Sequence, residues 1–182
     1  MIEGENLILR IPTLADEKEI VEMVQEFKDV GEEKIVGAGG IENFKNYADW
    51  IKNNENYLHE ETVPQGKVTS TQFISVRKSD GKIVGFIQLR HKLNDFLLNY
   101  GGHIGDSVRP TERKKGYATE QIVLCNRYAQ SLGIGKILIT CKEWNVGSRK
   151  SIIKSGGKYE SSISNPYEGN AVMERYWIEN NL

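Results

Sequence analysis

Apolar and polar residues follow two different periods along this chain of 182 residues. Apolar positions that recur every three to four residues predict amphipathic helices. The predicted helices cover residues 14–27, 44–58, 117–132 and 147–154. Short runs of branched apolar and aromatic residues predict strands. The predicted strands cover residues 7–11, 73–77, 83–89, 102–109, 136–141, 158–162 and 172–178.

Structure-breaking residues between these segments predict how the elements connect. Ser79, Asp80 and Gly81 separate two strand candidates, which predicts an antiparallel hairpin. Pro110 ends the strand over 102–109, because proline cannot donate to a strand ladder. A helix and a buried strand follow, which makes one strand-helix-strand unit. We therefore expect an α/β (α+β) fold in which about four helices flank a mixed, mostly antiparallel sheet of six to seven strands.

Composition narrows the class of protein. Hydrophobic residues make up 38% of the chain and charged residues 27%, which is typical of one globular domain, here 1–182. No apolar run approaches the roughly 18 residues that span a bilayer, and the first five residues lack the features of a signal peptide. We therefore expect a cytoplasmic protein without a membrane partner. Cys125 and Cys141 form no Cys-x-x-Cys pair, so we expect free thiols and no metal site.

Charge is distributed unevenly along the chain. Residues 1–66 carry 15 acidic and 6 basic side chains, a net charge of −9, whereas the remainder carries 10 acidic and 18 basic ones, a net charge of +8. This division fits one region that faces an anionic ligand and another that tolerates a cationic one, although solvated surface charge produces the same imbalance. The basic patch is short and lacks interleaved aromatic residues, which argues against a nucleic-acid partner.

The segment 113–118 is the strongest candidate for binding chemistry. It reads Arg-Lys-Lys-Gly-Tyr-Ala and opens the helix predicted over 117–132. The first amides of a helix have no intrahelical acceptor and bind anions, and Gly116 lets the backbone approach a ligand closely. These features predict a diphosphate cradle, although a solvated basic turn would contain the same residues. The motifs Gly-x-x-x-x-Gly-Lys-Ser/Thr and Gly-x-Gly-x-x-Gly are absent, which disfavours nucleoside triphosphates and NAD.

This six-residue pattern resembles the signature Arg/Gln-x-x-Gly-x-Gly/Ala of the GNAT superfamily of acetyl-coenzyme A dependent N-acetyltransferases. A second resemblance lies downstream, where Asn145 begins a helix after a strand and Ser148 follows three residues later. The order of predicted elements also resembles the GNAT fold from end to end. Two further stretches, 102–105 and 175–178, resemble a little-described bacterial branch of predicted acetyltransferases.

The resemblance implies a site for acetyl-coenzyme A as co-substrate, with no metal. Backbone groups of the strand end would bind the pantetheine arm, the amides of 113–119 would hold the pyrophosphate, and the Asn145 side-chain amide would contact the pantetheine. The implied cofactor-binding residues are Val108, Arg109, Arg113, Lys114, Lys115, Gly116, Tyr117, Ala118, Thr119, Asn145 and Ser148. The two lysines would reach either the adenosine phosphate or solvent.

Catalytic residues are less clearly marked. The resemblance implies that the backbone amide of Val108 meets the oxyanion of the transition state. Many relatives carry a tyrosine acid seven residues after the asparagine, whereas this chain has Ile152 there. A different tyrosine, an ordered water or no acid at all are the alternatives. Asp106 shares a strand face with Val108 and is the candidate base. His103, on the opposite face, is the other candidate. For each of them, the alternative is a solvated polar side chain without a catalytic role.

The acceptor is expected to be a small-molecule or peptide amine. Its site would be formed by the loop at Gly39 and Gly40, the second helix and the segment 91–100. The acidic first third, with Glu32, Glu33, Glu60 and Glu61, favours a cationic amine such as a polyamine, an aminoglycoside or a peptide amino terminus. A module that binds coenzyme A without turnover is the alternative function, and a homodimer is left open.

Overall fold

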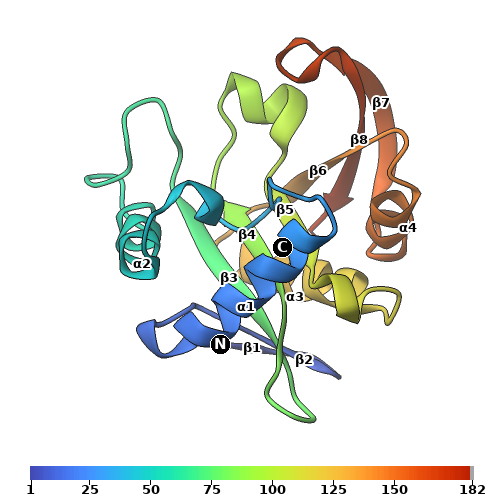
Figure 1. Cartoon of the computed structure of the whole chain (residues 1–182). Coiled ribbons are helices and arrows are strands. Elements are labelled where there is room, and N and C mark those ends of the chain that lie inside the picture. The colour runs from blue at the N-terminus through green and yellow to red at the C-terminus, as the bar shows by residue number, and fades with distance from the viewer. Residues whose placement is uncertain (181–182) are drawn as a thin grey trace.

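The computed structural model describes residues 1–180 and contains one mixed sheet (Figure 1). The eight strands lie in the order β1-β2-β3-β4-β5-β6-β8-β7, and every neighbouring pair is antiparallel except β5 and β6. The strands are β1 Ile2–Glu3, β2 Leu7–Arg10, β3 Ser70–Arg77, β4 Ile83–Arg90, β5 Ile104–Val108, β6 Lys136–Lys142, β7 Lys158–Asn165 and β8 Ala171–Glu179.

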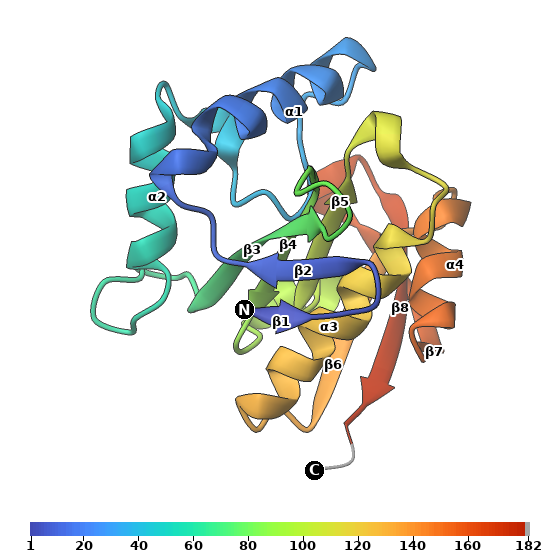
Figure 2. The ribbon, with the colours of Figure 1, turned by 90° about the horizontal axis from the view of Figure 1, so that it is seen from below.

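Helices cover both faces of this sheet. The α-helices are α1 Glu17–Asp29, α2 Tyr47–Asn56, α3 Tyr117–Ser131 and α4 Val146–Lys154. Figure 2 shows α1 and α2 on one side of the sheet, and α3 and α4 on the other. Short 3-10 turns cover Leu14–Asp16, Ile41–Asn43, Pro110–Glu112 and Pro166–Glu168, and a π turn, η3, covers Leu97–Gly101. No helix within residues 1–180 is long and apolar enough to cross a membrane.

The predicted α/β fold, with four helices and a mostly antiparallel sheet, is confirmed. The sheet has eight strands instead of six or seven, because Ile2 and Glu3 add a short edge strand that pairs Ile2 with Leu9. Two residues are too few to show an alternating pattern. The second helix begins at Tyr47, later than predicted, because the Asn46 side chain accepts from the Asp49 amide and caps it there.

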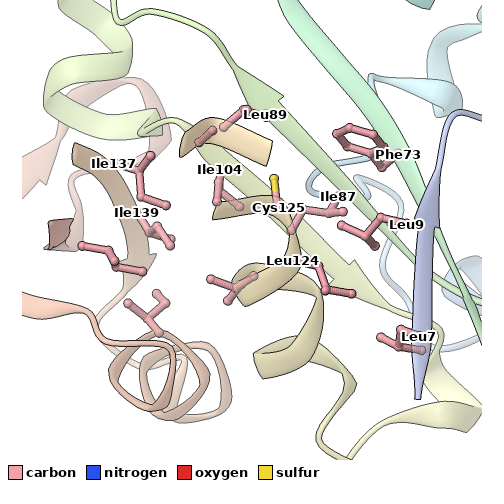
Figure 3. Packing of buried hydrophobic residues seen from close by; sticks show 14 of the residues in the cluster. Leu7, Leu9, Phe73, Ile87, Leu89, Ile104, Leu124, Cys125, Ile137 and Ile139 are labelled. Atoms are coloured by element: carbon pink, nitrogen blue, oxygen red, sulfur yellow. The ribbon is translucent and has the colours of Figure 1, made fainter. Parts of the chain in front are cut away.

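The larger hydrophobic core fills the space between the sheet and the α3/α4 layer (Figure 3). Apolar side chains from β2, β3, β4, β5 and β6 point toward α3, where Ile122, Leu124 and Cys125 meet them. Ile152 of α4 joins the same core and is completely buried. This packing holds α3 against the central strands, so the start of α3 has a fixed position relative to the end of β5.

A second core lies on the other face, beneath α1 and α2. Ile20, Met23 and Phe27 of the predicted helical stripe are all buried in it. Trp50 of α2 packs edge-on against Phe86 of β4 at 6.1 Å between ring centroids. Its indole Nε1 donates to the Ala38 carbonyl at 2.8 Å, so α2 holds the glycine-rich loop that follows α1.

Candidate active site

The parallel strands β5 and β6 separate near the middle of the sheet. They share a single backbone pair, Ile104 with Ile139, and the carboxyl-terminal part of β5 then has no strand on its β6 side. His103 joins the two strands just before this point, since its amide donates to the Leu138 carbonyl at 2.7 Å and its Nδ1 accepts from the Leu138 amide at 2.9 Å. The result is a split that opens toward the carboxyl ends of both strands.

The backbone of β5 presents free polar groups to this split. The Arg109 amide donates to the Val84 carbonyl of β4 at 2.8 Å. Because amide directions alternate along a strand, the N–H and C=O groups of Asp106 and Val108 point the other way, toward the split. Of these four groups, the Val108 carbonyl accepts from the Arg113 side chain. Arg109 was predicted to bind the coenzyme through its backbone together with Val108. The Arg109 N–H instead points away from the split, toward β4.

The start of α3 lies next to the end of β5 and carries a run of free amides. None of the six backbone N–H groups of 114–119 has an acceptor within residues 1–180. Gly116 has a left-handed φ of 87°, and this conformation lets the chain turn into the helix. Apart from its neighbours along the chain, no atom lies within 4 Å of the position that a Cβ on Gly116 would occupy, so the amides face open space. Such an array, together with the positive end of the helix dipole, fits a polyanion such as a diphosphate.

The basic side chains of this segment are engaged to different extents. Arg113 forms a fork-to-fork ion pair with Glu32 at 2.7 and 2.8 Å, and its Nε donates to the Val108 carbonyl at 3.1 Å. Lys115 binds the buried carboxylate of Glu112 at 2.7 Å. Lys114 is exposed and makes no ion pair with the described residues. Lys114 is therefore the side chain of the three that is free to meet an incoming phosphate.

Across the split, Asn145 and Ser148 lie together at the start of α4. The Asn145 Oδ1 accepts from the Ser148 amide at 3.0 Å and caps the helix. Its Nδ2 has no acceptor within residues 1–180, so the amide group is available as a donor. The carboxyl ends of parallel strands meet at one edge of a sheet, and Asn145 follows β6 there as Val108 ends β5. The two halves of the predicted site are thus brought to the same edge.

Asp106 points to the α3 side of the sheet. Its Oδ2 accepts from the Gln121 side chain at 2.8 Å, and Gln121 in turn accepts from Ser75. Burial raises the pKa of Asp106 to about 6, partly offset by the Gln121 hydrogen bond. The other base candidate, His103, is buried between strands with its Nδ1 occupied, and burial lowers its pKa to about 4. Asp106 is therefore the one of the two that titrates near neutrality.

The tyrosines that could replace the missing acid lie in different surroundings. Ile152 belongs to the core. The Tyr176 hydroxyl is buried and donates to Glu174 at 2.9 Å. Tyr159 and Tyr167 are exposed, and the Tyr117 hydroxyl accepts from Arg77 at 3.5 Å. None of these contacts singles out one tyrosine as an acid.

The α1/α2 side of the split is lined by the glycine-rich loop and two other segments. A Cβ at Gly37 would lie 2.2 Å from the Gly105 carbonyl, so only glycine fits there. The rings of Phe96, Tyr100 and Tyr167 contact one another at 5.6–5.9 Å between centroids and join η3 to the β7–β8 hairpin. The sequence had predicted that the glycine loop and the segment 91–100 form the acceptor site, but it had not included the β7–β8 hairpin. The sequence signal for this hairpin is the run of turn residues at 165–170.

Salt bridges tie these segments to each other. Glu168 of the hairpin pairs with Lys142 at the end of β6 and with Lys34 beside the glycine loop. Two of the four acidic residues that had favoured a cationic acceptor are neutralised, since Glu60 pairs with Lys92 and Glu32 with Arg113. Glu33 and Glu61 are exposed and make no ion pair within the described residues. No cluster of three or more metal-ligating side chains occurs within residues 1–180.

A split parallel pair beside a helix start with free amides is the frame of an acyl-coenzyme A binding transferase. The family model described as an acetyltransferase (GNAT) domain matches residues 6–158. The chain therefore belongs to the GNAT family of N-acetyltransferases, which confirms the resemblance of the signature segment.

Solved structures share the fold at low sequence identity. The microcin C7 self-immunity acetyltransferase MccE, in complex with acetyl-CoA and AMP, is 18% identical with a TM-score of 0.69, over 97% of this chain and 94% of that one. RimL, a ribosomal L7/L12 α-N-protein acetyltransferase in complex with coenzyme A, is 14% identical with a TM-score of 0.69, over 97% and 95%. AAC(6')-Ib, in complex with ribostamycin and coenzyme A, is 15% identical with a TM-score of 0.66, over 97% and 94%. No curated protein matches the sequence significantly.

Proposed function

We propose that this protein uses acetyl-coenzyme A to acetylate a primary amine by direct transfer. The observation that carries the proposal is the run of six free amides at 114–119 beside the open edge of β5. The amides would hold the pyrophosphate, with Arg113 and Lys114 nearby. The pantetheine arm would then follow the split and pair with Val108 as an added strand, while the Asn145 Nδ2 donates to it from the β6 side.

This arrangement separates the two substrates. The start of α3 lies on the α3/α4 side of the sheet, so the coenzyme reaches the split from that side (Figure 2). The glycine loop, η3 and the β7–β8 hairpin surround the other side. The acceptor amine would therefore approach from the α1/α2 side and meet the thioester within the split.

The reaction requires one bond to form and one to break at the thioester carbonyl. The lone pair of the neutral amine attacks the carbonyl carbon, the C–N bond forms, and the C–S bond breaks with its electron pair on sulfur. The Val108 amide, which faces the split, would stabilise the oxyanion, a contribution on the order of 3 kcal/mol. Asp106, whose carboxylate lies on the α3 side of the sheet, would accept the amine proton through an intervening water. The thiolate would leave as such or take a proton from water.

Calorimetric titration with acetyl-coenzyme A tests the cofactor site. Gly116→Glu places a carboxylate among the free amides and is expected to weaken binding roughly tenfold or more. Gly133→Glu is the matched control, because Gly133 has a left-handed φ of 75° and open surroundings at the other end of the same helix. Gly116→Ala reports the backbone strain alone. Equal affinity of the wild type and Gly116→Glu would refute the proposed site.

A module that binds coenzyme A without turnover is the second candidate, favoured by Ile152 in place of a tyrosine. The acceptor panel that separates the two includes small-molecule amines and peptide amino termini, because the structural neighbours include a ribosomal-protein acetyltransferase and AAC(6')-Ib in complex with ribostamycin. Thioester consumption that rises when amines are added supports the enzyme. Tight binding of acetyl-coenzyme A with no amine-dependent consumption supports the module.

A further inference from the structure

Arg90, the last residue of β4, places its guanidinium on the acceptor side of the sheet. Its Nη1 donates to the carbonyls of Gly101 and Gly102 at 2.9 and 3.1 Å, where η3 returns to β5. Its Nη2 lies 3.3 Å from the position that a Cβ on Gly105 would occupy, and the Gly37 amide nitrogen lies 3.2 Å from that same point. The guanidinium thus lies between β4, β5, η3 and the glycine loop.

This guanidinium lacks a countercharge. No Asp or Glu within the described residues forms an ion pair with Arg90. Burial alone lowers the pKa of Arg90, to about 10, so it remains charged at neutral pH. A partly buried charge without a partner is costly to the fold. An anionic ligand at this place would supply the missing negative charge.

Unused hydrogen-bond donors lie close together at this place. Arg90 has five N–H donors, and those on Nε and Nη2 have no acceptor within residues 1–180. These atoms are reachable by solvent, because neither appears among the fully buried unpartnered atoms of the chain. The Gly37 amide, next to them, also lacks an acceptor in the described part of the chain. Planar guanidinium donors match the two oxygens of a carboxylate or a phosphate.

We propose that Arg90 and the Gly37 amide bind an anionic oxygen group, a carboxylate or a phosphate, on the acceptor amine. The inference rests on the proposed acetyltransferase function and names its substrate class. Gly105 precedes Val108 by three residues, about 10 Å along the strand. The acceptor therefore carries its reacting amine and its anionic group within about 10 Å of each other, in contrast to the purely cationic amine that the acidic first third of the sequence had favoured.

Matched pairs of amines test this inference by direct binding to the coenzyme A-loaded protein. The pairs are γ-aminobutyrate with 4-aminobutanamide, 6-aminohexanoate with 6-aminohexanamide, and O-phosphoethanolamine with ethanolamine. We expect the wild type to bind the anionic member of at least one pair roughly tenfold or more tightly. The carboxylate and phosphate arms distinguish the two sources of negative charge. If no anionic member is preferred, the inference is wrong.

Variants of Arg90 assign that preference to this side chain. Arg90→Gln is expected to abolish it, Arg90→Lys to keep part of it, and Arg127→Gln, an exposed arginine of α3, to leave it unchanged. Circular dichroism checks that each variant folds, and Arg90→Lys retains a charge if Arg90→Gln does not fold. A preference that persists in a folded Arg90→Gln protein would assign the anion site elsewhere.

Acetyl-coenzyme A titrations on the same samples separate the two proposals. Arg90 touches no part of the proposed coenzyme site, so Arg90→Gln should bind acetyl-coenzyme A as the wild type does. Failure of the wild type to bind acetyl-coenzyme A would refute the proposed function. Normal binding of acetyl-coenzyme A without any preference for anionic amines would refute only the inference about the acceptor.

Discussion

Arg113 of the signature segment and Glu32 of the loop after α1 form an ion pair with two parallel hydrogen bonds, at 2.7 and 2.8 Å. The Arg113 guanidinium also lies 5.6 Å from the centre of the Phe27 ring and donates from Nε to the Val108 carbonyl. One side chain thus joins the proposed pyrophosphate cradle, the proposed pantetheine edge and the α1 layer. The charge available to an incoming phosphate depends on this contact.

Removing the Glu32 charge should strengthen coenzyme binding. Glu32→Gln leaves Arg113 without its counterion and removes one negative charge near the phosphates, so we expect severalfold higher affinity for acetyl-coenzyme A at low salt. Both side chains are about two-fifths exposed, so the free energy of unfolding should change by less than about 1 kcal/mol. Glu33→Gln is the control, because Glu33 is an exposed neighbour without an ion pair in the described residues. Equal affinities of both variants and the wild type would show that Glu32 does not restrain Arg113.

Asn145 can be tested separately as a helix cap and as a cofactor ligand. Asn145→Ala removes the cap on α4 and should cost about 1 kcal/mol of stability as well as coenzyme affinity. Asn145→Asp keeps an acceptor for the Ser148 amide and adds a favourable charge at the helix start, but it loses the Nδ2 donor. We therefore expect Asn145→Asp to unfold at or above the wild-type temperature and to bind acetyl-coenzyme A more weakly. Wild-type affinity in Asn145→Asp would limit Asn145 to capping.

Asp106 should make both activity and stability depend on pH near 6. If its carboxylate is the base, kcat/KM rises as the pH passes the raised pKa of about 6. Asp106→Asn should remove this limb of the pH profile and lower the plateau, whereas a structural Asp106 would leave the limb in place. Initial rates with a reactive amine from pH 5 to 8 decide between these outcomes.

The raised pKa of Asp106 also predicts the direction in which stability changes with pH. The folded protein binds a proton at Asp106 more tightly than the unfolded chain, whose pKa is near 4, so stability falls as the pH rises from about 4 to 6. At pH 7, Asp106→Asn should therefore have a free energy of unfolding higher than that of the wild type by on the order of 1–2 kcal/mol. At pH 3.5 the two proteins should have similar free energies of unfolding in a denaturant titration. A constant difference across this range would mean that the carboxyl is not perturbed in solution.

Glu112 is a structural centre of the signature segment. Its buried carboxylate accepts from Lys115, Lys82 and Arg77 at 2.6–2.7 Å, and these partners lower its pKa to about 2. Stability from this group is present above pH 4.5 and is lost as the pH falls toward 2. Glu112→Gln should cost about 3 kcal/mol at pH 7, because Lys115 and Lys82 lose their counterion and Arg77 keeps only Asp80.

Urea unfolding at pH 7 checks the Glu112 prediction. Glu61→Gln is the control, because Glu61 is exposed and makes no ion pair within the described residues. A cost below about 1 kcal/mol for Glu112→Gln would show that the cations relax into solvent when the carboxylate is removed.

The sequence by itself determined the order and type of the helices and of every strand except β1, and the place of the signature segment. These follow from local causes: the apolar stripe of α1, the proline that ends β5 and the glycine that opens α3 act within a few residues of the chain. Family membership also followed from six consecutive residues and a second motif. Each of these signals is complete in a short stretch of sequence.

Tertiary structure decided how the charges and strand edges of the candidate site are used. The split depends on one pair between Ile104 and Ile139 and on His103, which lies 35 residues from its partner Leu138. The acidic first third suggested a cationic ligand, yet Glu32 is neutralised by Arg113, 81 residues away. Arg90, one of 24 basic residues in the sequence, is distinguished by being partly buried while forming no ion pair with a described residue. Pairing, burial and isolation of charge depend on contacts between distant residues, so they become defined only when the chain is folded.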